Sequence, residues 1–358
     1  MGLLAIWSKI WPVLLAIIFF GLIVFIHELG HFLTAKLFKV KVNEFSIGMG
    51  PKILGFGKKD TRYSWRLFPI GGYVSMEGED EESEDENSFA NKKLWQRFII
   101  VAAGAVMNII LGFVIVTVMM STQDAIGSRT IAEFSKNAVT SQSLKENDKI
   151  IEINDRHVYS SYDLSFLLMR DNDATIDFKV IRDGKKVDVK NVKFNTAKPD
   201  KNSEASIVLD FSIYGVRPTF LNTIKVGYLT TISLGRMVWI SLFDLITGQY
   251  GLNELSGPIG TVGYIANVAQ TTVKTDITPL FMIMALITIN IGIFNLLPIP
   301  ALDGRRLFFM LIEMVRRKPV NQKYEKWIHA VGLILLLVFM VIISFSDILK
   351  LFRGGFNV

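Results

Sequence analysis

The stretch WPVLLAIIFFGLIVFIHELGHFLTAKLF, residues 11–38, determines the architecture of this chain. It opens with a long uncharged apolar run, and about 20 such residues are enough to cross a bilayer as a helix. His27, Glu28 and His31 follow sixteen residues into the stretch. Ionisable side chains at that depth in a membrane helix are costly, and they usually mark a functional site. The stretch therefore predicts a membrane helix that carries chemistry.

The spacing of these three residues is the H-E-x-x-H pattern. Positions i and i+4 share one face of a helix, so both imidazoles can reach one zinc ion while Glu28 lies beside them as a base. The alternatives are a fortuitous polar patch and a structural metal site. Catalytic zinc usually has three protein ligands and keeps a fourth position for water. Because the chain has no cysteine and only four histidines, we expect the third ligand to be a carboxylate.

Asp303 is the favoured third ligand. It belongs to the segment NLLPIPALDG, residues 295–304. Pro298 and Pro300 cannot continue a helix, and unwound backbone at membrane depth is tolerated where it lines a cavity or contacts water. If both segments run in the same direction across the membrane, Asp303 and the two histidines lie at matching depth. The alternative is a loop aspartate that caps the next helix.

The composition fits a membrane protein with a water-soluble part. Half of the 358 residues are apolar, 20% are charged and the mean hydropathy is +0.37. Four apolar segments are expected to span, starting near residue 11 and at residues 98–120, 279–297 and within 327–349. Basic residues gather beside these segments, which places those loops in the cytosol and both chain ends outside. The net charge of +6 therefore reflects membrane topology, and we expect no nucleic-acid partner.

The remaining segments predict smaller elements. Residues 42–78 are punctuated by glycine and predict short strands, followed by an acidic run, 77–86, interpreted as a solvated linker. Residues 124–214 predict a small α+β module with a hairpin that turns at Asp183 and Gly184. Residues 219–247 carry Lys225 and Arg236 on one helix face, which favours an interfacial helix over a fifth span.

These interpretations give a polytopic α-helical membrane protein with four transmembrane helices, a β-hairpin region and an inserted α+β domain. The expected parts are the first transmembrane helix at 1–38, a cytosolic-side hairpin region and acidic linker at 39–92, the second transmembrane helix at 93–121, the extracytoplasmic domain at 122–216, an interfacial amphipathic helix and linker at 217–260, the third transmembrane helix at 261–304, a cytosolic basic loop at 305–326, and the fourth transmembrane helix and tail at 327–358.

The two polar motifs, HELGH at 27–31 and NLLPIPALDG at 295–304, resemble those of the site-2 protease family of intramembrane zinc metalloproteases, in particular its bacterial RseP-like branch with one PDZ domain. Further segments resemble the same family. They are GGYV at 71–74, which resembles its membrane-associated β-hairpin, GAVMN at 104–108, LSGPIG at 255–260, and residues 124–214, which resemble its PDZ module.

The resemblance implies an enzyme that uses zinc to cleave transmembrane segments in regulated intramembrane proteolysis. His27, His31 and Asp303 would ligate Zn²⁺, and Glu28 would be the general base. Asn295 would stabilise the scissile carbonyl. Substrate-binding residues would be Asn290, Gly71, Gly72 and Tyr73.

The implied substrates are single-pass membrane proteins, either pre-trimmed anti-sigma factors or remnant signal peptides. The implied location is the bacterial plasma membrane, with the active site toward the cytosol and the PDZ-like domain outside. That domain lacks a clear Gly-rich carboxylate-binding loop, which favours exclusion of bulky substrates over capture of peptide C-termini. The hairpin either receives the substrate strand or only seals the site. A zinc-binding pseudoprotease scaffold and an ion transporter are the alternative functions.

Overall fold

The computed structural model describes residues 3–57, 61–79, 83–171, 173–197, 206–248, 256–272, 275–318, 320 and 322–352. Contacts within the chain divide it into two compact units. The first unit comprises Met1–Ile115 and Ser241–Val358, and the second comprises Val116–Ile240.

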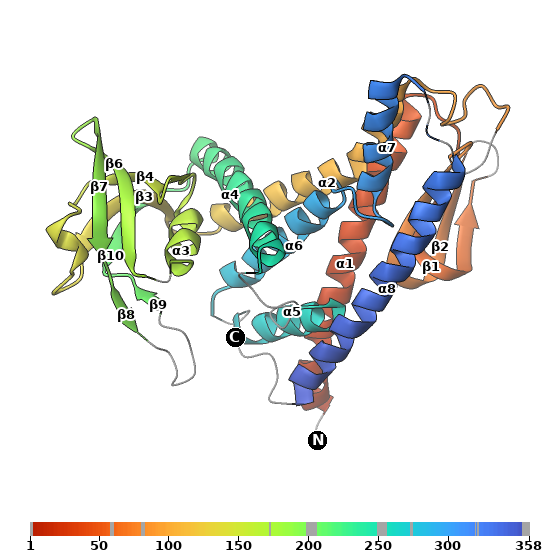
Figure 1. The fold of residues 1–358 in the computed structure, drawn as a ribbon. Coiled ribbons are helices and arrows are strands. Elements are labelled where there is room, and N and C mark those ends of the chain that lie inside the picture. The colour runs from red at the N-terminus through yellow and green to blue at the C-terminus, as the bar shows by residue number, and fades with distance from the viewer. Residues whose placement is uncertain are drawn as a thin grey trace. The chain divides into compact units, whose positions relative to one another are not determined.

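The first unit consists of helices and one small sheet (Figure 1). Its elements are α1 (Leu3–Leu37), β1 (Val42–Phe56), β2 (Arg62–Met76), α2 (Leu94–Ser121), α5 (Pro258–Thr272), α6 (Thr278–Phe294), α7 (Asp303–Arg316) and α8 (Gln322–Phe352). Helix α2 continues into the second unit, which ends within α4 (Phe220–Ile246).

Four of the described helices are long and apolar enough to cross a membrane. They cover Ile10–Leu37, Leu94–Ser121, Phe220–Ile246 and Trp327–Lys350. The first, second and fourth expected spans are therefore present as long apolar helices. The third expected span, residues 279–297, is present as the shorter apolar helix α6, but residues 261–304 as a whole do not form one helix. They hold most of α5, the 17-residue apolar helix α6 and an irregular segment at 295–302.

Helix α4 is one of these four long apolar helices, whereas the expected third span is not among them. Its mean hydropathy of 1.4 is lower than the 2.6 to 2.8 of the other three helices. The helix carries Lys225 and Arg236, the two residues from which an interfacial helix was predicted. Length and composition allow this helix to span, so the interfacial position stays a prediction.

The predicted basic loop at 305–326 was wrong for its first half, which is helix α7. The helix begins after Leu302, whose backbone is extended, and ends at Arg317, whose φ of 55° is left-handed. Leu307 and Met310 are buried in a cluster with Ala35 and other residues of the first unit. Apolar side chains at this spacing form one helical face between the basic residues, so burial of that face fixes the helix.

Strands β1 and β2 both bend and pair with each other more than once, so they form more than a simple two-stranded hairpin. Residues 44–47 pair with 62–65 on one side and with 72–75 on the other, and residues 52–56 pair with 63–66. The order across the sheet is therefore 52–56, 63–66, 44–47 and 72–75. Gly48 and Gly50 permit the bend in β1, since both have left-handed φ angles of 83° and 86°. The prediction of strands within residues 42–78 is confirmed.

The acidic run at 77–86 is anchored rather than simply solvated. Glu77 accepts hydrogen bonds from Ser83 and Asn43, at 2.7 and 2.9 Å. Asp85 accepts one from Lys41 at 2.9 Å, and this bond lowers the pKa of Asp85 below its usual value. Residues 80–82 of the run lie outside the described residues.

The second unit is built on an antiparallel sheet in the order β10-β3-β4-β6-β7, with β5 paired to β4. Its elements are β3 (Ile126–Phe134), a 3-10 turn (Thr140–Gln142), β4 (Lys149–Ile153), β5 (Arg156–His157), α3 (Ser161–Met169), β6 (Thr175–Arg182), β7 (Lys185–Lys193), β8 (Asn195–Ala197), β9 (Ser206–Val208) and β10 (Phe211–Val216). The predicted turn is confirmed, because Asp183 and Gly184 join β6 to β7 with φ angles of 50° and 76°.

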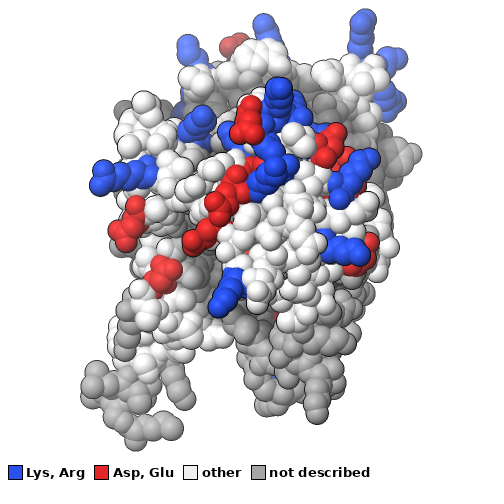
Figure 2. Space-filling model, turned by 90° about the vertical axis from the view of Figure 1, so that its left-hand side faces the viewer, with Lys and Arg blue, Asp and Glu red and all other residues white. Residues whose placement is uncertain are grey.

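One face of α3 closes the core of this sheet. Leu164, Leu167 and Leu168 are buried with side chains such as Ile150 and Phe178. On the face of the sheet domain shown in Figure 2, lysines and arginines stand among aspartates and glutamates. Interspersed charges of both signs are typical of a surface in contact with water. The predicted water-soluble α+β domain is thus present as a folded unit.

A buried polar network attaches α4 to α3 within the second unit. Asp163 is fully buried, and its carboxylate accepts hydrogen bonds from Arg236 at 2.5 Å and from Ser233 at 2.6 Å. The backbone N–H groups of Tyr159 and Ser160 donate to the same carboxylate at 2.8 and 2.9 Å. A buried charge needs such partners to be tolerated, so this contact fixes how the sheet domain joins α4.

Candidate metal centre

Three of the predicted site residues converge in the first unit. His27 Nε2 lies 2.9 Å from Asp303 Oδ2, and His31 Nε2 lies 3.1 Å from the same oxygen. The two histidine Nε2 atoms are 3.2 Å apart. Residues separated by more than 270 positions in the sequence therefore present three ligand atoms to one point.

This triangle fits a zinc ion. Zinc bonds of 2.0–2.1 Å in tetrahedral geometry place ligand atoms about 3.3 Å apart, close to the 2.9 to 3.2 Å found here. Asp303 Oδ2 is buried, and its close contacts are with the two imidazole nitrogens that would share the metal. Two imidazoles and one carboxylate also leave a fourth zinc position for water or substrate, which is the donor set of catalytic sites.

Each ligand reaches the cluster for a local reason. His27 and His31 lie one turn apart on α1, which places their rings on one face. Asp303 follows the irregular 295–302 segment as the first residue of α7. The chain folds tightly there, since a Cβ on Gly304 would lie 2.6 Å from the Leu296 carbonyl carbon. The prediction that the proline-containing segment interrupts the helix is confirmed.

Helix α2 forms the wall behind the two imidazoles. A Cβ on Gly104 would lie 2.7 Å from His27 Cε1 and in contact with His31 Nε2. A Cβ on Gly30 would overlap the Ala103 carbonyl oxygen and lie 2.9 Å from Met107 Cγ. Glycine therefore lets α1 and α2 approach closely, a common device where membrane helices meet.

Two groups on α2 contact the outer nitrogens of the histidine rings. The carbonyl oxygen of Ile100 lies 2.8 Å from His31 Nδ1, and Asn108 Nδ2 lies 3.3 Å from His27 Nδ1. Such outer partners orient metal-binding imidazoles. Sequence reasoning did not assign these contacts, although the GAVMN motif contains Asn108. A backbone carbonyl such as that of Ile100 leaves no signal in the sequence.

The sheet brings one of its predicted residues beside Glu28, the predicted general base. A Cβ on Gly72 would lie 3.3 Å from Glu28 Cγ and 2.9 Å from the Ser46 carbonyl oxygen. Gly71 has a left-handed φ of 89°. Tyr73 instead directs its hydroxyl to Arg66, which donates to it at 2.6 Å. Among these three residues, the structure places Gly72 against Glu28.

The two asparagines of α6 have a different position. Asn295 is the C-cap of α6, and its side-chain amide donates to the Ile291 carbonyl at 3.0 Å. Asn290 lies within α6 and is half-buried. The recorded contact of Asn295 is thus with its own helix, and the substrate roles of both residues stay predictions.

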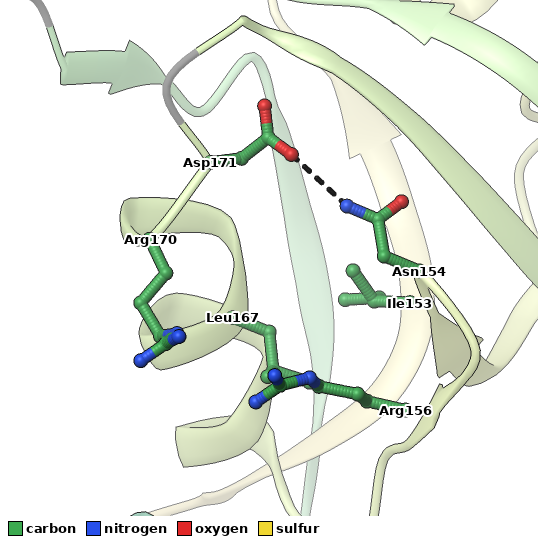
Figure 3. Close-up of a pocket in the computed structure, with 6 residues that line it drawn as sticks. All are labelled: Ile153, Asn154, Arg156, Leu167, Arg170 and Asp171. Atoms are coloured by element: carbon green, nitrogen blue, oxygen red, sulfur yellow. Dashed lines mark hydrogen bonds between the residues drawn. The ribbon is translucent and has the colours of Figure 1, made fainter. Parts of the chain in front are cut away.

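A separate pocket of about 270 Å³ lies in the second unit, between α3 and the β4–β5 turn (Figure 3). Ile153 and Leu167 line its apolar part, and Asn154 donates to Asp171 at 2.9 Å. Arg156 and Arg170 complete the lining. Asp171 is the single acidic residue in this lining and no histidine joins it, whereas His27, His31 and Asp303 form a three-ligand group among the described residues.

Comparisons with known proteins agree with this geometry. The family model described as Peptidase family M50 matches residues 15–339. A protein of Fusobacterium nucleatum with the name "Putative zinc metalloprotease" is 38% identical over 354 residues, covering 95% of this chain and 99% of the relative. The "Regulator of sigma-W protease RasP" of Bacillus subtilis is 30% identical over 422 residues, covering 94% and 98%. The "Zinc metalloprotease RasP" of Bacillus licheniformis is 29% identical with the same coverage.

Proposed function

This chain belongs to peptidase family M50 and is an intramembrane zinc metalloprotease, and from that premise we propose that it cleaves single-pass membrane proteins inside their transmembrane segments. The observation that carries the proposal is the triangle of His27, His31 and Asp303, with Glu28 next in sequence and the sheet beside it. The protein is a bacterial membrane protein, so its natural substrates share the bilayer with it.

Zinc held by the three ligands supplies Lewis-acid activation of water and of a carbonyl oxygen. We assign the proton transfers to Glu28, whose carboxylate takes a proton from the attacking water and passes it to the leaving amide nitrogen. The position of Glu28 supports this role, because it shares the helical turn of both histidines and lies against Gly72. Asn295 is assigned the role of stabilising the oxyanion that develops at the scissile carbonyl, on the basis of its sequence motif alone.

The substrate must lose its helix before it is cut, because a spanning helix hides its amides in internal hydrogen bonds. The 72–75 segment suits an unwound substrate. Among residues 42–56 and 61–79, it is paired on one side only, by residues 44–47. An extended peptide can add to such an edge through main-chain hydrogen bonds. The contact between Gly72 and Glu28 would then bring a peptide bond to the carboxylate.

The substrate class is proposed to be membrane stubs that another protease has already shortened, such as anti-sigma factors or remnant signal peptides. The name of the Bacillus subtilis relative, a regulator of sigma-W protease, supports the first of these. We place the second unit outside the cell as a PDZ-like domain that excludes bulky substrates, and the metal centre toward the cytosol. The bases beside the apolar helices support this orientation.

Reconstitution tests this proposal. The zinc-loaded protein is placed in liposomes with a single-span reporter, made once with a large folded outer domain and once without it. Mass spectrometry maps the products. We expect a cut within the span of the shortened reporter and much slower cleavage of the long one, with Glu28→Gln as the inactive control. Cleavage only outside the span would contradict the proposed reaction, and equal rates for both reporters would contradict the proposed filter.

A further inference from the structure

We propose that Asn108 is a positioning residue that supports zinc ligation by His27, because its Oδ1 atom accepts a hydrogen bond from the Nδ1–H of the metal-binding tautomer. The proposal rests on the zinc site proposed above. It concerns a side chain of α2 that supplies no ligand and is fully buried.

Asn108 faces the metal centre from the wall formed by α2. It lies four residues after Gly104, on the same helix face, and a Cβ at Gly104 would contact both imidazoles. Its side-chain amide lies 3.3 Å from His27 Nδ1. A polar side chain buried inside a membrane helix is costly unless it finds a partner, and His27 is the partner within reach.

Zinc ligation determines which atom of the amide must face the ring. His27 presents Nε2 to Asp303 and His31. A neutral imidazole that gives its Nε2 lone pair to a metal carries its hydrogen on Nδ1, so Nδ1 then needs an acceptor. The Nδ2 group of Asn108 is a donor and cannot serve. The Oδ1 atom can, and it is the atom of this amide that is buried without a partner among the described residues.

A half-turn of the amide satisfies both groups. It exchanges Oδ1 with Nδ2 while the rest of the side chain stays in place. Nδ1–H of His27 then donates to Oδ1. With Nδ2 facing the ring, the hydrogen of His27 belongs on Nε2 and points at Asp303, which is 2.9 Å away. The amide can therefore pair with either tautomer, and zinc ligation selects the accepting orientation.

His31 supplies an internal comparison. Its Nδ1 lies 2.8 Å from the Ile100 carbonyl oxygen, which can only accept. The tautomer of His31 is thus fixed by backbone. Both ligating rings receive their outer partner from α2, but only the partner of His27 is a side chain, which makes this contact open to substitution.

The test measures zinc affinity rather than cleavage. Purified full-length protein is titrated with Zn²⁺ against a competing chelator. Asn108→Leu keeps similar volume and removes the acceptor, and we expect zinc affinity to fall about 10- to 100-fold, the usual effect of losing an outer partner. Asn108→Asp keeps an acceptor and should retain most of the affinity. Asn267→Leu makes the same chemical change on α5, beside Gln270, which hydrogen-bonds to Ser8 near the start of α1, and it should leave zinc affinity at the parent value.

Nitrogen-15 spectra of the histidine rings give a readout that general destabilisation does not produce. The chain has only four histidines. In the zinc-loaded parent, we expect the Nδ1 hydrogen of His27 to be hydrogen-bonded and slow to exchange. In Asn108→Leu the same hydrogen should exchange faster, while the exchange of the His31 ring hydrogen stays unchanged. Parent-like zinc affinity in Asn108→Leu would overturn the proposal. Unchanged exchange of the His27 Nδ1 hydrogen in Asn108→Leu would also overturn it, whether or not Asn108→Asp folds. A parent protein that bound no zinc would instead overturn the zinc site itself.

Discussion

Gly104 offers the sharpest test of how α2 shapes the metal centre. In the variant Gly104→Ala, the added methyl group would lie 2.7 Å from His27 Cε1 and overlap His31 Nε2. Non-bonded carbon atoms prefer separations of about 3.5–4.0 Å, so the overlap with His27 is about 0.8 Å or more. Either α2 moves away from α1 or both imidazoles turn out of the ligand triangle.

The expected effect follows from that displacement. Overpacking of a close contact costs about 1–3 kcal/mol of stability. A displacement of about 1 Å at a catalytic centre costs about 100-fold in rate. We therefore expect Gly104→Ala to lower zinc affinity together with cleavage of a single-span reporter, and to lower the thermal unfolding midpoint.

Gly112→Ala is the matched control on the same helix. Its added methyl group would overlap Ile289 Cγ1 and lie 3.0 Å from Ile289 Cδ1. The stability cost should be similar, but zinc affinity should match the parent. Both variants are measured by chelator competition, reporter cleavage and thermal unfolding. Parent-like zinc affinity and cleavage in Gly104→Ala would refute the idea that glycine at this position makes room for the histidines.

Three further substitutions separate the parts of the mechanism. Asp303→Asn should reduce bound zinc per chain in metal analysis, and a parent-like content would remove Asp303 from the ligand set. Gly72→Ala should slow cleavage about tenfold or more, since it crowds the Glu28 side chain that acts in proton transfer, while zinc content stays constant; an unchanged rate would count against the role of this sheet edge. Asp163→Ala should destabilise the second unit by about 3–5 kcal/mol, because Arg236 would lose its buried partner; unchanged hydrogen exchange in α3 and α4 would contradict this.

Local patterns predicted much of this protein. The H-E-x-x-H spacing places His27 and His31 on one helix face, and two prolines end the helix before Asp303. The Asp183–Gly184 pair predicts its hairpin turn. Each of these signals lies within a few residues of the feature that it determines, so the sequence alone is sufficient.

Features that depend on distant contacts could not be predicted in the same way. The pairing of residues 44–47 on both sides arises when β1 and β2 fold together. The contacts of Gly104 and Asn108 with His27 join two helices that are far apart in the sequence. Helix α7 was missed because its basic residues masked the spacing of Leu307 and Met310, which are buried against α1 and other elements of the first unit.

The most direct measurement compares the parent with Glu28→Gln in zinc content and reporter cleavage on the same samples. Both proteins should bind one zinc ion per chain, since Glu28 is not a ligand in the proposed site. The parent should cut the reporter within its span, and Glu28→Gln should leave it intact, because a glutamine cannot accept the proton. Cleavage by Glu28→Gln at the parent rate would contradict the assignment of this helix as the catalytic centre.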